Sequence, residues 1–321
     1  MPIPKSVSRK ITKASLLEKL RFIDSDDASR NRVLQLDTHF QHKIRAHTCG
    51  LTLGDSLLGK FNTNPFVLLI HASSRGYSRV DQIERDILPA KQFSSMETSA
   101  GRMVEEVVLP VYGWECVASA MHTANSALDG RKVGEDSYEV VTLKSGPRCL
   151  NDEMSENFAD AIIQNATSWS ESAATPRVSF TYGVLYGTEK RSNKKDWHIL
   201  RKLAEKCATS STCQVITHPD NRWNCTVTID GTPVEATVRI GTDWWTHLGG
   251  DNCLIEVLVA MIRACITTAT EDENTIDMMI SDLPLLISTA TVPADYNVAL
   301  LQRRQLPWLF LMAAHFCDEL L

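Results

Sequence analysis

The sequence of 321 residues has little of several features that assign a protein to a class at once. Aromatic residues make up 7% of it, and no run reaches the roughly 18 uncharged apolar residues of a membrane-spanning helix. The basic N-terminus lacks the apolar core of a secretory signal, and the 9 cysteines form no close-set framework. These absences argue against a membrane protein or a disulfide-stapled one, and they predict a cytoplasmic protein with reduced thiols.

Common catalytic signatures are missing as well. The sequence has no Gly-x-Gly-x-x-Gly fingerprint, no Gly-x-Ser-x-Gly elbow and no His-Glu-x-x-His pair. The thiols of Cys207, Cys213 and Cys225, with His218, are spaced unlike any common zinc finger, so we expect ordinary cysteines there. Dinucleotide enzymes, serine hydrolases of the elbow type and zinc proteases are therefore unsupported.

Charge is unevenly distributed along the chain. The net charge is -6, yet residues 251–321 alone hold 10 acids against 3 basic residues. Residues 186–206 hold 7 basic residues against 3 acids, and the N-terminal segment is basic too. Because local basic segments rather than net charge decide contact with phosphates, a nucleic-acid partner is compatible with this sequence.

Helical and strand patterns alternate along the chain. We expect helices at 11–45 with a break at 24–29, at 78–88, at 101–109 up to Pro110, from 151 or 152 onward, at 195–208 and at 252–268. Strands are expected in 114–128, at 138–144, within 177–186, at 213–217 and at 234–240. This order predicts an α/β fold with a mixed central β-sheet flanked by helices.

The organisation we expect is one compact domain. A helical N-terminal extension would cover residues 1–60, a catalytic core 61–270 and a helical C-terminal extension 271–321. No shift in composition marks a firm boundary between them.

The strand expected at 138–144 and the segment before it hold an acid and a lysine of the kinds used in catalysis. Lys144 ends the strand 138–144 just before a Gly-Pro turn, and Asp129 precedes that strand. An aspartate that binds a divalent ion and a lysine that orients water or offsets phosphate charge are suited to phosphodiester cleavage. The alternatives are that Asp129-Gly130 is only a turn and that Lys144 only reaches solvent.

Six segments, in order, resemble the type II restriction endonuclease family named for EcoO. They are NPF at 64–66, GRMVEEVVLPVYG at 101–113, VTLKSG at 141–146, YGVLYG at 182–187, WHILR at 197–201 and VRIGTDWW at 238–245. The resemblance spans residues 62–266. It implies a restriction-endonuclease-like fold of the PD-(D/E)xK superfamily. It also implies a Mg²⁺-dependent homodimer that cuts double-stranded DNA at short palindromes, including sites of the GGNCC type.

The same resemblance implies roles for particular residues. The metal-binding aspartate falls on Asp129, although Leu128 precedes it instead of proline, and the catalytic lysine falls on Lys144. The position of the second acid holds Thr142, so another acid has to take that place. We expect it to be Glu106, which lies just before the segment VVLP.

Two further acids remain candidates for the second carboxylate. Glu139 is near in sequence but falls on the opposite face of the strand unless a bulge rotates it. Glu156 falls on the helix that follows, away from its apolar face.

Polar and basic residues after the central strands are candidates for DNA contact. Arg148, four residues after the lysine, resembles the arginine that reads guanine in enzymes cutting CCGG-like sites. Asn151 either contacts a base edge or caps the following helix. Phosphate contacts are expected from Lys190, Arg191, Lys194 and Lys195.

The sequence thus predicts a sequence-specific DNA endonuclease with Mg²⁺ as cofactor. Two alternatives stay open. One is a catalytically impaired DNA-binding protein of the same fold, because Thr142 replaces an acid. The other is a repair or junction nuclease.

Overall fold

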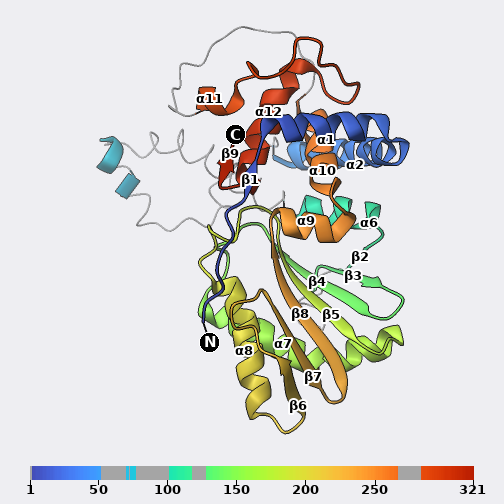
Figure 1. Cartoon of the computed structure of the whole chain (residues 1–321), viewed down its shortest axis with the longest axis vertical. Helices are drawn as coiled ribbons and strands as arrows, with labels where there is room; N and C mark the ends of the chain where they lie inside the picture. The colour runs from blue at the N-terminus through green and yellow to red at the C-terminus, as the bar shows by residue number, and fades with distance from the viewer. Residues whose placement is uncertain (1, 52–69, 72, 77–100, 118–127, 267–282) are drawn as a thin grey trace.

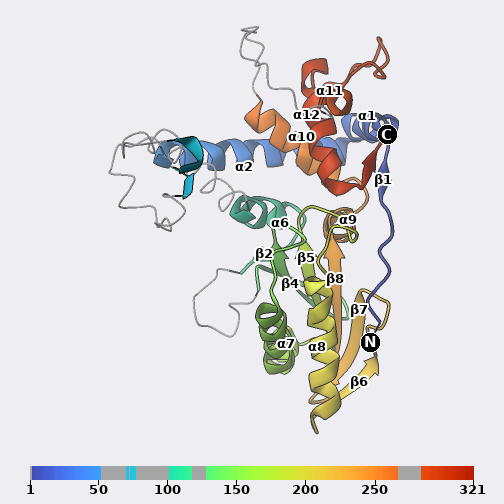
Figure 2. The same ribbon diagram turned by 90° about the vertical axis from the view of Figure 1, so that its left-hand side faces the viewer.

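The computed structural model describes residues 2–51, 70, 71, 73–76, 101–117, 128–266 and 283–321. A β-sheet with two helices forms the lower part of the molecule in Figure 1, and a group of helices forms the upper part. Figure 2 shows the same two parts from the side, with α7 and α8 against the sheet and α2 running across above it.

The sheet has seven strands in the order β2-β3-β4-β5-β8-β7-β6. The central strands β4, β5 and β8 are parallel, and every other neighbouring pair is antiparallel, so the predicted mixed sheet is confirmed. The strands are β2 (Glu115–Cys116), β3 (Gly130–Val133), β4 (Tyr138–Lys144), β5 (Val178–Val184), β6 (Cys213–Thr217), β7 (Asn224–Ile229) and β8 (Thr232–Ile240).

One face of the sheet is covered by α7 (Asp152–Ala173) and α8 (Lys195–Thr209). Side chains of the two helices and of this sheet face form a continuous apolar core. Within it the ring of Trp169 stacks on Phe180 of β5 at a centroid distance of 6.4 Å. Both helices agree with the patterns that predicted them.

The upper part is built from both ends of the chain. The helices α1 (Lys13–Ser25), α2 (Asp27–Leu51), α10 (Cys253–Cys265) and α12 (Leu306–Ala313) share one apolar core, which also takes in Val141 and Leu143 of β4. We call these four helices the helical layer. The short helix α11 (Leu283–Ile287) packs beside α12, followed by the 3₁₀ turns η2 (Arg303–Gln305) and η3 (Ala314–Phe316). Strands β1 (Lys10–Ile11) and β9 (Glu319–Leu320) pair in parallel, so the two ends of the chain lie together.

Two elements link the layer to the sheet. Helix α9 (Thr242–Gly249) follows β8, and its Trp244 packs over Gly183 of β5. A Cβ atom at Gly183 would lie 2.9 Å from the Trp244 ring and 2.8 Å from the Leu143 side chain, so only glycine allows this approach. The π-helix η1 (Val104–Val108) and the turn α6 (Leu109–Val111) form the second link.

Several boundaries differ from the predicted ones. The helix does not end before Pro110, because it continues from η1 through α6 and ends at Val111, one residue after the proline. Asp129-Gly130 is not a turn, since Gly130 begins β3 and pairs with Val141. Strand β7 was not predicted. The helix expected at 78–88, the NPF segment at 64–66 and most of the strand region 114–128 lie outside the described residues.

No helix in the described part of the chain is long and apolar enough to cross a membrane.

Candidate active site

Asp129 lies at the edge of the central strands. Its backbone N–H donates to the Val141 carbonyl at 2.8 Å, and its Oδ2 accepts from the Leu143 N–H at 2.5 Å. The carboxylate is therefore fixed against β4. Burial raises the pKa of Asp129, while the Leu143 N–H and the charge of Lys144 act in the opposite direction.

Lys144 is the last residue of β4 and is half-buried. Its Nζ lies 5.9 Å from the centroid of the Phe158 ring on α7. The positive charge of Lys144 lowers the pKa of Asp129 and also that of Glu105. The predicted aspartate and lysine are thus within electrostatic range of each other.

Glu105 on η1 is the acid that the structure brings to this pair. It is half-buried, and its pKa is raised to about 7, first by burial and then by the negative charge of Asp129. Its backbone carbonyl accepts from the Cys116 thiol on β2 at 2.7 Å. Asp129, Lys144 and Glu105 therefore share one electrostatic environment beside the end of β4.

Glu106, the acid expected at this place, points elsewhere. Its carboxylate is exposed and forms an ion pair with Lys43 of α2. The two neighbouring glutamates therefore interact with different groups. Glu105 interacts with Asp129, and Glu106 pairs with Lys43 of α2.

The other candidates for the second acid interact with other groups, and the position in the pattern itself holds a buried threonine. Thr142 is buried on β4 with 2% of its surface exposed. Glu139 lies on the opposite face of β4, where its Oε2 is 3.6 Å from Nε2 of His247 on α9. Glu156 pairs across to α8, with Oε1 3.2 Å from Nζ of Lys206.

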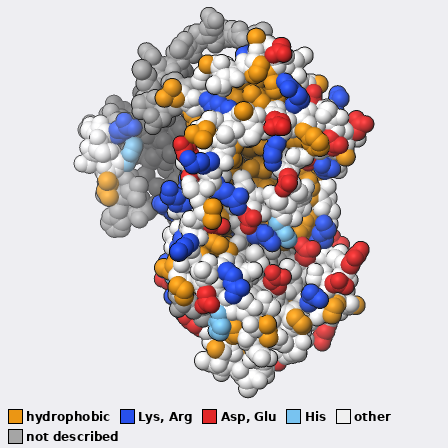
Figure 3. All heavy atoms as spheres, viewed as in Figure 1, with side chains coloured by type: hydrophobic (Ala, Val, Ile, Leu, Met, Phe, Trp, Pro, Cys, Tyr) orange, Lys and Arg blue, Asp and Glu red, His pale blue; other side chains and the backbone are white. Residues whose placement is uncertain are grey.

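Two of the residues expected to contact DNA are brought together by the loops that follow β4 and β5. The Nε of Arg148 donates to the Arg191 carbonyl at 3.1 Å, and both side chains belong to exposed residues. Arg191 in turn donates through Nη2 to the Cys317 carbonyl at 2.8 Å, near the end of the chain. Lys190 beside it is exposed. Figure 3 shows Lys and Arg side chains intermixed with Asp and Glu across the middle of one face of the molecule.

The remaining three have partners within the chain. Asn151 is the N-cap of α7, since its Oδ1 accepts from the Met154 N–H at 2.8 Å. Lys195 donates to Oδ1 of Asp152 at 2.5 Å. Lys194 donates to the hydroxyl of Ser6 at 2.6 Å.

The carboxylates of Asp129 and Glu105 are the oxygen ligands that this site offers to a divalent ion. Within the described ranges no group of three or more His, Cys, Asp and Glu side chains converges closely enough to hold a metal. Mg²⁺ commonly binds through one or two carboxylates and takes its other ligands from water and substrate phosphate. Asp129 and Glu105 carry like negative charges that repel each other, and a pair of carboxylates of this kind fits such an ion.

The sequence favoured Glu106 over its neighbour Glu105. The tandem Glu105-Glu106 was a usable signal, because adjacent residues of a helix point about 100° apart and so meet different surroundings. Which of them faces the sheet depends on η1 being a π-helix, which adds a residue per turn and shifts the faces of the following residues.

Comparison with known proteins gives two results. A search of curated proteins returned no match to this chain. The model of the family described as type II restriction endonuclease EcoO109I matches residues 35–217, which is more than half of the chain and includes Glu105, Asp129 and Lys144. Membership of such a family implies site-specific cleavage of DNA. This chain belongs to the type II restriction endonuclease EcoO109I family.

Proposed function

We propose that the protein is a Mg²⁺-dependent endonuclease that cuts double-stranded DNA at a short palindromic site. The observation that carries the proposal is that Asp129, fixed against β4 by the Leu143 N–H, and Lys144, the last residue of β4, lie within electrostatic range of each other and of Glu105. A half-buried pair of carboxylates beside a lysine is a donor set for phosphodiester hydrolysis.

Each residue has a distinct role in this proposal. Asp129, held by the Leu143 N–H, and Glu105 bind the metal ion. Mg²⁺ bound there would offset charge on the scissile phosphate and lower the pKa of the attacking water. Lys144 donates a hydrogen bond to that water or to the phosphate. Water adds to phosphorus as the bond to the 3′ oxygen breaks, which leaves a 5′-phosphate and a 3′-hydroxyl.

The DNA-binding surface in this proposal includes the joined loops after β4 and β5. Arg148 is exposed on the first loop and contacts guanine, while Lys190 and Arg191 on the second contact phosphates. Lys194 and Lys195 hold Ser6 and Asp152, so they contribute to DNA contact only after giving up these partners.

The proposed enzyme acts as a homodimer, because two identical subunits match the two scissile phosphates of a palindrome by symmetry. The apolar residues of α12, among them Leu309 and Phe310, are buried within the chain's own core. Trp308 on α12 and Leu285 on α11 remain exposed and are the apolar surface we propose for pairing.

A digest of plasmid DNA with and without Mg²⁺ tests the proposal. The wild-type protein should give discrete fragments. Asp129→Asn and Lys144→Ala should each slow cleavage on the order of 100-fold or more while DNA binding in a gel shift stays intact. Lys202→Ala is the matched control, because Lys202 lies on α8 beside Glu156 and away from Asp129.

The alternatives give other outcomes in the same digest. DNA binding without cleavage would identify a catalytically impaired binding protein, which the buried Thr142 in place of an acid favours. Cleavage confined to branched substrates would identify a junction nuclease. Wild-type rates in both variants would remove Asp129 and Lys144 from the mechanism.

A further inference from the structure

The helical segment that carries Glu105 is attached to its surroundings at both ends. This segment, the Glu105 helix, comprises η1 and α6 (104–111). After its last turn, the Tyr112 hydroxyl donates to Oε2 of Glu256 on α10 at 2.6 Å. In its first turn, Glu106 forms the ion pair with Lys43 of α2.

Glu256 is the strongest point of this attachment. Its side chain has no exposed surface, and Arg32 of α2 donates to both of its oxygens, through Nε at 2.8 Å and Nη2 at 2.7 Å. A buried carboxylate keeps its charge only where such partners surround it. The Tyr112 ring is also held, because it lies so close to α9 that a Cβ at Gly249 would be 2.2 Å from it.

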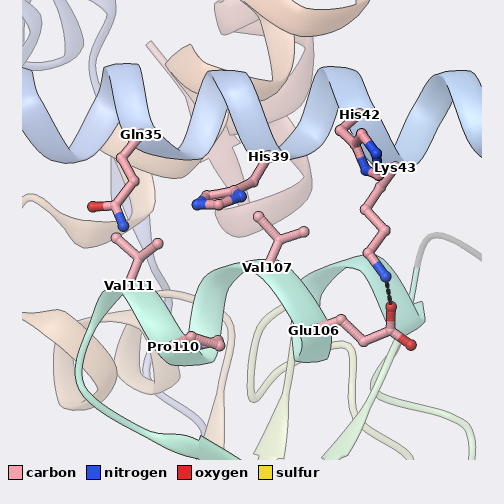
Figure 4. A pocket seen from close by; sticks show the side chains of 8 residues that line it. All are labelled: Gln35, His39, His42, Lys43, Glu106, Val107, Pro110 and Val111. Atoms are coloured by element: carbon pink, nitrogen blue, oxygen red, sulfur yellow. Dashed lines mark hydrogen bonds and ion pairs between the residues drawn. The ribbon is translucent and has the colours of Figure 1, made fainter.

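Helix α2 runs along the whole of the Glu105 helix. Arg32 and Lys43 are eleven residues apart, close to three helical turns, so they lie on one face of α2. Figure 4 shows this face opposite Val107 and Val111, with a cavity of about 150 Å³ between the two helices. Val107, Val108 and Leu109 of the Glu105 helix pack into the apolar core that α2 shares, and the polar attachments lie at its two ends.

The attachments matter because η1 is a π-helix. A π-helical turn is rare and occurs mostly as a single turn within an α-helix, so neighbouring structure has to hold it in place. An exposed ion pair such as Lys43–Glu106 contributes little, on the order of 1 kcal/mol or less. The buried hydrogen bond of Tyr112 to a charged acceptor is the stronger restraint.

We propose that Tyr112 is a positioning residue for the active site. Its hydrogen bond to Glu256 fixes the Glu105 helix on the helical layer, and so keeps the Glu105 carboxylate beside Asp129, where both bind the metal ion. This inference rests on the metal-binding role proposed for Glu105.

Binding of Mn²⁺ to the DNA-free protein, followed by the paramagnetic resonance of the free ion, tests the inference without cleavage. Tyr112→Phe removes the hydroxyl and keeps the ring. It should weaken Mn²⁺ binding by about tenfold, the lower end of what losing one hydrogen bond to a charged group costs. Tyr296→Phe is the matched control, because the Tyr296 hydroxyl is also buried in the helical layer but donates to the Leu17 carbonyl at 2.8 Å. It should leave Mn²⁺ binding unchanged.

Glu105→Gln, measured in parallel, distinguishes the metal-binding role of Glu105 from the positioning role of Tyr112. Weak binding in Glu105→Gln and Tyr112→Phe, with normal binding in Tyr296→Phe, supports the inference. Wild-type binding in Tyr112→Phe with weak binding in Glu105→Gln overturns the inference and leaves the metal role of Glu105 standing. Wild-type binding in Glu105→Gln overturns that role and the inference with it. Equal weakening in both tyrosine variants would show general loosening of the helical layer, which also overturns the inference.

Discussion

Glu105 titrates near neutral pH, and the Mg²⁺ requirement of cleavage should therefore fall as the pH rises from 6 to 8. Its pKa is about 7, because burial and the charge of Asp129 disfavour the ionised form. With that pKa, roughly 10% of Glu105 is ionised at pH 6 and roughly 90% at pH 8. Only the ionised carboxylate is a good metal ligand, so the Mg²⁺ concentration for half-maximal cleavage should drop about tenfold over this range.

The assay is cleavage of plasmid DNA at a series of Mg²⁺ concentrations, repeated at pH 6, 7 and 8. Glu105→Gln should need more Mg²⁺ at pH 8 and should lose the pH dependence. Glu106→Gln should keep it, because Glu106 pairs with Lys43 instead of facing Asp129. Burial raises the pKa of Asp129 too, so a remnant of pH dependence in Glu105→Gln would have the same sign. A wild-type Mg²⁺ requirement that is flat between pH 6 and 8 would refute the reasoning.

The same pKa has a consequence for the stability of the metal-free protein. The raised pKa means that the unfolded chain loses this proton at lower pH than the folded chain does. Glu105 therefore opposes folding increasingly as the pH rises from about 4.3, the usual value for glutamate, through 7. Glu105→Gln should raise the Tm of the metal-free protein at pH 8 and change it less at pH 5. A lower Tm at pH 8 would contradict the assigned surroundings of Glu105.

Three further predictions follow from other parts of the molecule. Light scattering of the DNA-free protein should give twice the chain mass of 35.8 kDa, and Trp308→Glu should shift it toward the single-chain mass. Lys190→Ala should lower the salt dependence of DNA binding by about one unit of slope, as expected for one phosphate contact, whereas Lys202→Ala should not. Gly183→Ala should lower stability by roughly 1–3 kcal/mol in urea unfolding, because its Cβ would press on Leu143 and Trp244.

The sequence predicts an element correctly where its residue pattern and its burial agree. Strand β4 was predicted with the bounds that the structure has, since its apolar run and the turn chemistry after it are local. Strand β7, antiparallel to both β8 and β6, alternates buried and half-buried residues, which is a weaker signal, and it was not predicted. Asp129-Gly130 has the composition of a turn but continues into β3, because pairing with β4 overrides local preference.

The sequence could not decide between Glu105 and Glu106 for a different reason. Periodicity assigns faces on the assumption of 3.6 residues per turn, and η1 departs from it. A departure of one residue exchanges the surroundings of Glu105 and Glu106. Nothing in the residue types of this pair distinguishes them, so only the packing of η1 between α2 and the sheet does.

Asp129 and Glu105 come from separate elements, and this bears on the absence of an acid at Thr142. In the pattern that this chain resembles, one strand supplies an acid and a lysine two residues apart, and the strand alone fixes their spacing. Here β4 supplies Lys144, β3 is preceded by Asp129 and a separate helix supplies Glu105. The geometry of the proposed metal site then depends on how that helix is held against α2 and α10, through Tyr112 and Glu256. If this site binds the metal ion, substitutions in the helical layer should affect metal binding before they affect DNA binding.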